Sequence, residues 1–239
     1  MKKLLFVMFA MVLLASGVQA QKKTTNKPNK PNVGVDGKNA NAMPVINLQD
    51  IILPPAHVGM DVPLIEALRA RQTIRDIMDE ELPMEIISSL LWSAYGFNRY
   101  DEQKRVAPSA VNVQEFDIYL FTNQGIYLYD ALKQMLRPVV EGDHRALISA
   151  QKHFAVAPVS VVIVANYDRM AKFKETADRD FYAAVDAGYV SQNIYLFCAS
   201  AHLATVACGG INRDDLAKIL NLKNGKALLA HPVGLPVRR

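Results

Sequence analysis

Residues 106–121 read VAPSAVNVQEFDIYLF, and the second half of this stretch has the pattern of a β-strand. Apolar residues alternate through EFDIYLF, which predicts a β-strand. The turn sequence NQG follows at 123–125, and IYLYD at 126–130 alternates again, so the two runs predict a β-hairpin. The first half carries little bulk, because Ala107 and Ala110 flank polar residues. We therefore expect something to lie close to that backbone.

Elsewhere the hydrophobic pattern mixes helices and strands without regular alternation, which favours an α+β sandwich over a doubly wound sheet. APVSVVIVANY is almost wholly apolar and predicts a strand buried on both faces. Helical spacing and end signals predict helices at 61–70, 81–97, 142–155, 179–203 and 213–220. Further strands are expected at 157–167, 203–210 and 226–236, and a charged loop at 98–106.

The N-terminal residues predict export. Lys2 and Lys3 precede the apolar run LLFVMFAMVLL and the small-residue stretch ASGVQA, a signal-peptide pattern with expected cleavage near Ala20. That run is too short for a stable membrane anchor. We expect a disordered linker at 21–44 and one domain at 45–239, in the periplasm or secreted.

The charge balance argues against nucleic acid as a partner. The chain has 27 Lys plus Arg and 23 Asp plus Glu, but seven of the basic residues and only Asp36 of the acidic ones lie before residue 45. The remaining 20 and 22 make the folded part slightly acidic. Cys198 and Cys208 both sit among apolar residues; a disulfide is conceivable in an exported protein, but two buried thiols are favoured.

Several common chemistries lack support in the sequence. Ser109 is not in a G-x-S-x-G elbow, and neither Cys lies in a catalytic motif, so a hydrolase is weakly supported. No GxGxxG follows a strand, which disfavours a Rossmann cofactor site. The histidines, at 57, 144, 153, 202 and 231, never show metal-ligand spacing, so no metal site is expected.

The segment ARQTIRDI at 70–77 is a candidate anion site. Arg71, Gln72, Thr73 and Arg75 offer two guanidinium groups, a hydroxyl and an amide within a few residues. Such donors can hold a phosphate and a polar ring. The alternative is a solvated helix end.

Two further segments could contact a ligand. Ser109, Asn112 and Gln114 offer hydrogen-bonding groups beside small residues, although a local cap or turn would use the same side chains. ACGG at 207–210 ends a strand with paired glycines, which let backbone N–H groups approach a ligand. The alternative there is an ordinary turn.

Taken together, these segments resemble the nitroreductase family of flavin enzymes over about residues 64–236, in particular its compact branch of azoline-oxidising (thiazole- and oxazole-forming) dehydrogenases. ARQTIR resembles R-R-S-x-R, with Gln72 replacing the second Arg, and APSAVNVQ resembles P-S-S/A-x-N-x-Q, with Glu115 following where many members have Pro. QGIYLYD resembles a hairpin of the compact branch. DAGYVSQN resembles the D-x-G-x-x-x-Q-N helix, and Gly209-Gly210 its flavin-contacting turn.

The resemblance implies a mainly antiparallel sheet flanked by helices, and an interlocked homodimer with FMN at each interface. Arg71, Thr73 and Arg75 would contact the phosphate, ribityl chain and pyrimidine edge, and N–H groups around the glycines would face flavin N5. The implied cofactor-binding residues are Arg71, Gln72, Thr73, Arg75, Pro108, Ser109, Ala110, Asn112, Cys208, Gly209, Gly210, Arg238 and Arg239. No catalytic acid or base is expected.

The implied activity is ping-pong hydride transfer through flavin N5, from a donor that is typically NAD(P)H to a small organic acceptor. An exported enzyme would meet little NAD(P)H, so a second hypothesis is an FMN-dependent dehydrogenase or oxidase of a peptide or small molecule. A third is a flavin-binding protein without turnover. The sequence does not identify the substrate.

Overall fold

The structure is a computed structural model that describes residues 48–56 and 62–237, all within one compact unit. Its centre is a seven-stranded sheet of order β1-β6-β5-β4-β7-β9-β8, with every neighbouring pair antiparallel. The strands are β1 (Ile51–Ile52), β4 (Phe116–Thr122), β5 (Gly125–Asp130), β6 (Met135–Glu141), β7 (Val159–Asn166), β8 (Ala204–Thr205) and β9 (Gly225–Gly234). A separate hairpin pairs β2 (Phe97–Arg99) with β3 (Lys104–Arg105).

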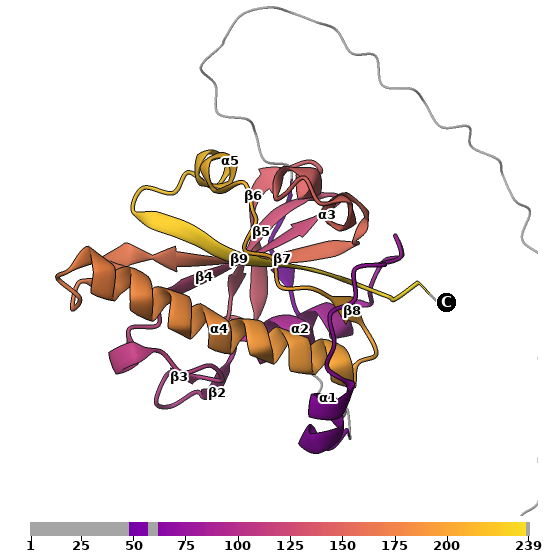
Figure 1. Ribbon diagram of the computed structural model, residues 1–239, viewed down its shortest axis with the longest axis horizontal. Helices are drawn as coiled ribbons and strands as arrows, with labels where there is room; N and C mark the ends of the chain where they lie inside the picture. Colours follow the sequence, from indigo (N-terminus) through magenta and orange to yellow (C-terminus); the bar gives the residue numbers. More distant parts are fainter. Residues whose placement is uncertain (1–47, 57–61, 238–239) are drawn as a thin grey trace, which may run out of the picture. The chain divides into compact units, whose positions relative to one another are not determined.

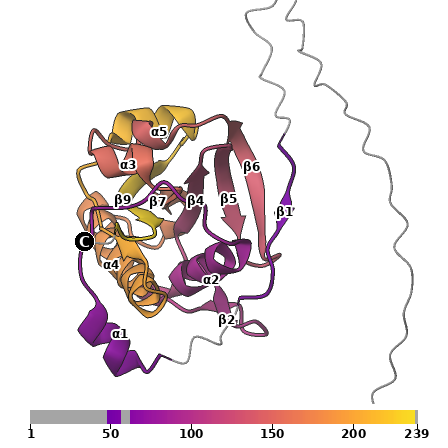
Figure 2. The same ribbon diagram turned by 90° about the vertical axis from the view of Figure 1, so that its right-hand side faces the viewer.

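Helices cover both faces of the sheet, as Figures 1 and 2 show. On one face α2 and α4 pack on the larger apolar core; on the other, α3 and α5 pack on a second core. The helices are α1 (Leu64–Ala70), α2 (Met84–Tyr95), α3 (Lys152–Val156), α4 (Thr176–Ser200) and α5 (Arg213–Ile219), with short 3-10 turns η1 (Ala110–Asn112), η2 (Arg145–Leu147) and η3 (Tyr167–Met170). This confirms the α+β sandwich with a mainly antiparallel sheet.

The strands expected around the opening stretch are present. β4 and β5 pair as the predicted hairpin, with Leu120 opposite Tyr127. β7 pairs with β4 on one side and β9 on the other, and seven of its eight residues are buried. Its continuous apolar run therefore reflects cover on both faces.

The helix expected at 142–155 is wrong. The structure has η2 and α3 there instead, separated by a loop. The main chain at Ile148 and the hydroxyl of Ser149 bond to the 210–212 turn, at 2.8 Å each. These hydrogen bonds to a distant turn take the place of the backbone bonds that a continuous helix would make in this segment.

Strand β6 has no counterpart in the sequence prediction, and the expected loop at 98–106 contains the β2–β3 hairpin. The sequence pattern did not predict β6 because the strand contains Pro138, and proline has no N–H to donate in a sheet. Only Met135 and Leu136 pair with β1, so the rest of β6 is an edge where proline is tolerated. The strand expected at 203–210 shrinks to β8 and an isolated bridge between Cys208 and Ala230.

Some predictions fall outside the described residues: the signal peptide at 1–20, the linker at 21–44, and Arg238 and Arg239. Within the described ranges, no helix combines the length and apolar character needed to span a bilayer. Cys198 and Cys208 are both free and buried, which confirms two buried thiols.

His231 in β9 is fully buried, and its imidazole contacts side chains of α4 and β8. Its Nε2 lies 2.8 Å from the Ser191 hydroxyl of α4, and its Nδ1 lies 3.2 Å from the Thr205 hydroxyl of β8. Burial lowers the pKa of His231 to about 3. The imidazole is therefore neutral in the folded state over the physiological range.

Acidification is expected to destabilise the fold through His231. The unfolded chain binds this proton below about pH 6.5 while the folded chain does not, so stability falls by about 1.4 kcal/mol per pH unit below that point. Urea unfolding at several pH values measures the slope. His231→Gln should flatten it, whereas His202→Asn, at an exposed histidine, should leave it unchanged. An unchanged slope in His231→Gln contradicts the assignment.

Candidate flavin site

The segment 71–76 runs beside β8 rather than continuing α1. The Ile74 N–H donates to the Thr205 carbonyl at 3.0 Å, and Ile74 packs against a small buried cluster. Because side chains alternate along an extended backbone, Arg71, Thr73 and Arg75 share the opposite side from Ile74. Gln72 lies on the Ile74 side, where both residues line a separate cavity of about 190 Å³. The structure thus separates Gln72 from the other three predicted residues.

Tyr195 of α4 holds this segment in place. Its hydroxyl lies 3.0 Å from the Thr73 hydroxyl and accepts a hydrogen bond from the Ala207 N–H at 2.9 Å. The Arg71 guanidinium lies over the Tyr195 ring, 5.2 Å from its centroid. The sequence prediction missed Tyr195, although it lies two residues after Asn193 of the recognised helix motif. Tyr195 therefore joins two of the three predicted segments.

The glycine turn presents open backbone. A Cβ at Gly209 would come no closer than 3.8 Å to Leu229, and one at Gly210 no closer than 3.8 Å to Gln151. The carbonyl of Gly209 accepts from Arg213 and that of Gly210 from Ser149. Neither glycine N–H donates within the described part of the chain. The carbonyls thus fix the turn while its N–H groups stay available.

Arg75 lies near the same turn. Its charge contributes to lowering the pKa of His153, after the larger effect of burial, and it offsets part of the burial that raises the pKa of Cys208. The Cys208 thiol lies 3.6 Å from His153 Nε2 and 3.8 Å from Gln151 Oε1. Gln151 and His153 were not predicted, because they belong to the segment 142–155 that was expected to be a regular helix.

The donors on this surface fit an anionic ligand. Among the described residues, neither Arg71 nor Arg75 forms a salt bridge, whereas nearby Arg69 pairs with Glu66 at 2.7 Å. Two guanidinium groups without carboxylates, a hydroxyl and an open glycine turn suit a phosphate and a polar ring edge. The residues present therefore fit FMN. We call the surface formed by Arg71, Thr73, Arg75, Tyr195 and Cys208–Gly210 the anion surface.

The 108–112 segment lies elsewhere on the chain. The Ser109 hydroxyl accepts from the Gln114 N–H at 3.0 Å, so the local-turn interpretation holds for that side chain. The Ala110 N–H donates to the Asp186 carboxylate of α4 at 2.7 Å. Val111 and Asn112 have positive φ, and Val111 is 62% exposed. A β-branched residue in this conformation is costly and is typical of functional segments.

One chain does not bring Pro108–Asn112 to the anion surface. Asp186 anchors the first and Tyr195 the second, nine residues apart on α4. That spacing gives about 13 Å of rise and about 180° of rotation, so the two segments lie on opposite edges of the helix. Apart from Gln72, the predicted site residues that the structure describes thus form two half-sites, the 108–112 segment and the anion surface.

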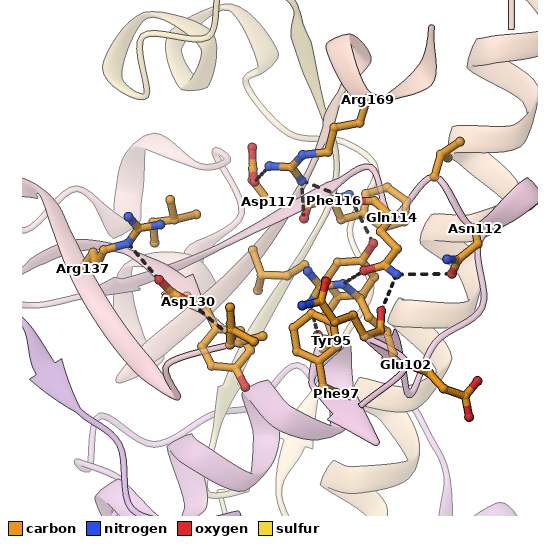
Figure 3. A pocket seen from close by; sticks show the side chains of 18 residues that line it. Tyr95, Phe97, Glu102, Asn112, Gln114, Phe116, Asp117, Asp130, Arg137 and Arg169 are labelled. Atoms are coloured by element: carbon orange, nitrogen blue, oxygen red, sulfur yellow. Dashed lines mark hydrogen bonds and ion pairs between the residues drawn. The ribbon is translucent and has the colours of Figure 1, made fainter. Parts of the chain in front are cut away.

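A cavity of about 570 Å³ adjoins the 108–112 half-site (Figure 3). Gln114 and Asn112 line it together with Arg105, Arg137 and Arg169. Arg105 lies between the rings of Tyr95 and Phe97, at 4.1 and 4.3 Å, and donates to Gln114 Oε1 at 2.9 Å. Gln114 also donates from its backbone N–H to the Ser109 hydroxyl and from its side-chain amide to Asn112 Oδ1 at 3.3 Å, so it supports the 109–112 turn, a role that the motif alone did not reveal.

Comparisons with known proteins identify the family of this chain. The family model described as the nitroreductase family matches residues 68–235. The nitroreductase-type protein MJ1384 of Methanocaldococcus jannaschii is 30% identical, over 73% of this chain and 91% of that protein. A crystal structure of a nitroreductase from Ralstonia eutropha superimposes with a TM-score of 0.74 and 31% identity, covering 80% of this chain and 90% of that one.

A third similarity concerns the fold alone. A chain of the Escherichia coli microcin synthetase McbBCD complex with truncated pro-MccB17 bound gives a TM-score of 0.59 at 18% identity, over 84% of this chain and 85% of that one. The family match covers both half-sites and the whole sheet from β4 to β9. The chain therefore belongs to the nitroreductase family of flavin-dependent oxidoreductases.

Proposed function

We propose that this protein binds FMN and uses it in ping-pong hydride transfer from a reduced donor to a small organic acceptor. The proposal rests on the guanidinium groups of Arg71 and Arg75, which lack carboxylate partners among the described residues. Arg71 lies over the Tyr195 ring, and Arg75 lies near Cys208, next to the open Gly209–Gly210 turn. Bound FMN supplies the hydride chemistry. The chain's own residues bind and orient it.

Each residue of the anion surface has a distinct part in that binding. Arg71 and Arg75 would hold the phosphate and the pyrimidine edge, where negative charge increases on reduction. Thr73, fixed by Tyr195, would hold the ribityl chain. The N–H groups of Gly209 and Gly210 would face the reacting edge of the ring, because no side chain shields them.

We further propose a homodimer in which each flavin site combines half-sites from two chains. The outward face of α4 carries Phe181, Val185 and Tyr189 at helical spacing, all exposed in one chain. An apolar stripe of this kind marks an interaction surface. We propose that this stripe packs on its own copy in a partner chain about a two-fold axis. The partner's 108–112 segment then completes the anion surface.

The electron donor is either NAD(P)H or the organic substrate itself. If the pattern at residues 1–20 directs export, as we propose, NAD(P)H is scarce where the enzyme works. The alternative is an FMN-dependent dehydrogenase or oxidase whose peptide or small-molecule substrate is itself the donor. The polar cavity next to Asn112 and Gln114 has room for part of an organic substrate, which supports the dehydrogenase or oxidase alternative.

The absorbance spectrum of the purified mature protein tests the proposal, followed by anaerobic titration with NADH and NADPH. We expect a yellow protein that binds added FMN with about one flavin per chain and bleaches with its donor. Bleaching only with an organic substrate favours the dehydrogenase. A flavin that no donor reduces favours binding without turnover. A protein that stays colourless with excess FMN contradicts all three.

A further inference from the structure

Two buried carboxyl groups, those of Glu115 and Asp186, interact with each other close to the 109–112 turn. Glu115 directly precedes β4, where its carbonyl accepts from the Asn166 N–H at 2.9 Å, and Asp186 lies in α4. The side chain of Glu115 is fully buried, and Asp186 is 3% exposed. One oxygen of Asp186 already accepts the Ala110 N–H at 2.7 Å. This contact connects the pair to the 108–112 half-site.

Glu115 lacks the partners that a buried carboxylate needs. Neither of its oxygens makes a hydrogen bond among the described residues. A buried, ionised carboxylate without donors is costly, and a second carboxylate beside it raises that cost. Glu115 can avoid both penalties by keeping a proton, which it can donate to Asp186.

The other charged and titratable groups around Glu115 do not neutralise it. Arg169 of η3 is the nearby cation, but it donates to the Gln114 and Phe116 carbonyls and pairs with Asp117 (Figure 3). Tyr95 of α2 accepts from the Phe116 N–H, and the charge of Glu115 raises its pKa further beyond the effect of burial. Burial raises the pKa of both carboxyl groups, and Asp186 adds to that of Glu115 by its charge.

We propose that Glu115 and Asp186 share a single proton, and that this shared proton fixes the Ser109–Asn112 turn in its flavin-binding shape. The order of contacts is Glu115 to Asp186 to the Ala110 N–H. The proton keeps Asp186 on the Ala110 N–H, because loss of the proton sets two like charges against each other and drives the carboxylates apart. Glu115 is thus a positioning residue. Its link to flavin rests on the proposed function above.

A pH dependence follows from the sign of this linkage. A carboxyl group with a raised pKa in the folded state stabilises the fold fully below its ordinary pKa, and that stabilisation is lost as the pH rises toward neutrality and beyond. Protection of the Ala110 amide against hydrogen exchange should fall over the same range. FMN affinity should fall with it, by up to about 10-fold for each unit of pKa difference between the free and bound forms.

The test compares Glu115→Gln and Asp186→Asn with the natural protein between about pH 5.5 and about pH 8.5. Gln keeps the shape of Glu and can donate to Asp186 at every pH. Asn keeps an acceptor for the Ala110 N–H and removes the like charge. Glu102→Gln, at an exposed carboxyl paired with Lys104, is the matched control. The readouts are infrared absorbance of a protonated carboxyl, Ala110 amide protection in the apoprotein, and the FMN dissociation constant.

We expect Glu115→Gln to remove the infrared band, to keep Ala110 protected at high pH, and to bind FMN with a pH-independent affinity close to that of the natural protein at low pH. Asp186→Asn should lose the pH dependence as well, and Glu102→Gln should retain it. A natural protein without the band, or a Glu115→Gln variant with the natural pH profile, overturns the proposal. If the apoprotein readouts behave as expected but FMN never binds, the shared proton stands and the proposed function fails.

Discussion

Replacing both free guanidinium groups, in Arg71→Met/Arg75→Met, is expected to weaken FMN binding by about 100-fold to 1,000-fold. Each charged hydrogen bond to a phosphate or ring oxygen contributes about 1.5–2 kcal/mol at a half-exposed position, and the two add to about 3–4 kcal/mol. The fold should survive, because neither side chain forms a salt bridge among the described residues. Titration of the apoprotein with FMN, followed by flavin fluorescence, measures the change.

Arg69→Met is the matched control for this pair of substitutions. Arg69 lies in α1, two residues before Arg71, but it is exposed and paired with Glu66. The Arg69→Met variant should bind FMN with the affinity of the natural protein. Arg71→Lys/Arg75→Lys should recover part of the lost affinity, because the charge returns without the planar donor pair. Natural affinity in the double Met variant would place the cofactor elsewhere.

Placing charge on the outward face of α4, in Val185→Glu/Tyr189→Glu, is expected to yield a folded monomer that binds no FMN. Both side chains are exposed in one chain, so the substitutions should cost the monomer little. A two-fold interface contains each substituted residue once from each chain, so the dimer would bury every introduced carboxylate in two copies. Burying carboxylates without a positive partner costs too much free energy for the dimer to form. Sedimentation or light scattering gives the mass, and flavin fluorescence gives the binding. Val156→Glu, on the exposed end of α3, should remain dimeric.

Hybrid dimers separate a shared site from a site within one chain. One chain carries Arg71→Met/Arg75→Met, and the other carries Ala110→Trp, which fills the 108–112 half-site. If each site draws on both chains, the hybrid has one site with both defects and one with none, so it recovers half of the bound FMN. If each chain holds its own site, both sites are defective and no binding returns.

Local pattern was sufficient for most of the secondary structure. The β4–β5 hairpin, the buried strand β7 and the long helix α4 follow from alternation, apolar runs and helical spacing, which report how each residue meets its own neighbours. The pattern failed at η2–α3, where a helical spacing is overridden by hydrogen bonds to a distant turn, and at β6, where Pro138 disguises an edge strand.

The site shows the same division more sharply. The order of residues identifies the functional groups that the chain carries: guanidinium groups at 71 and 75, small residues at 107–110, paired glycines at 209–210, and a glutamate at 115. Which of these groups lie together depends on how distant segments of the chain pack in three dimensions. Tyr195 binds Thr73, Asp186 binds Ala110, and α4 sends these contacts to opposite edges. Periodicity shows that a face is buried but not what covers it, because the covering residues lie more than 70 positions away in the chain.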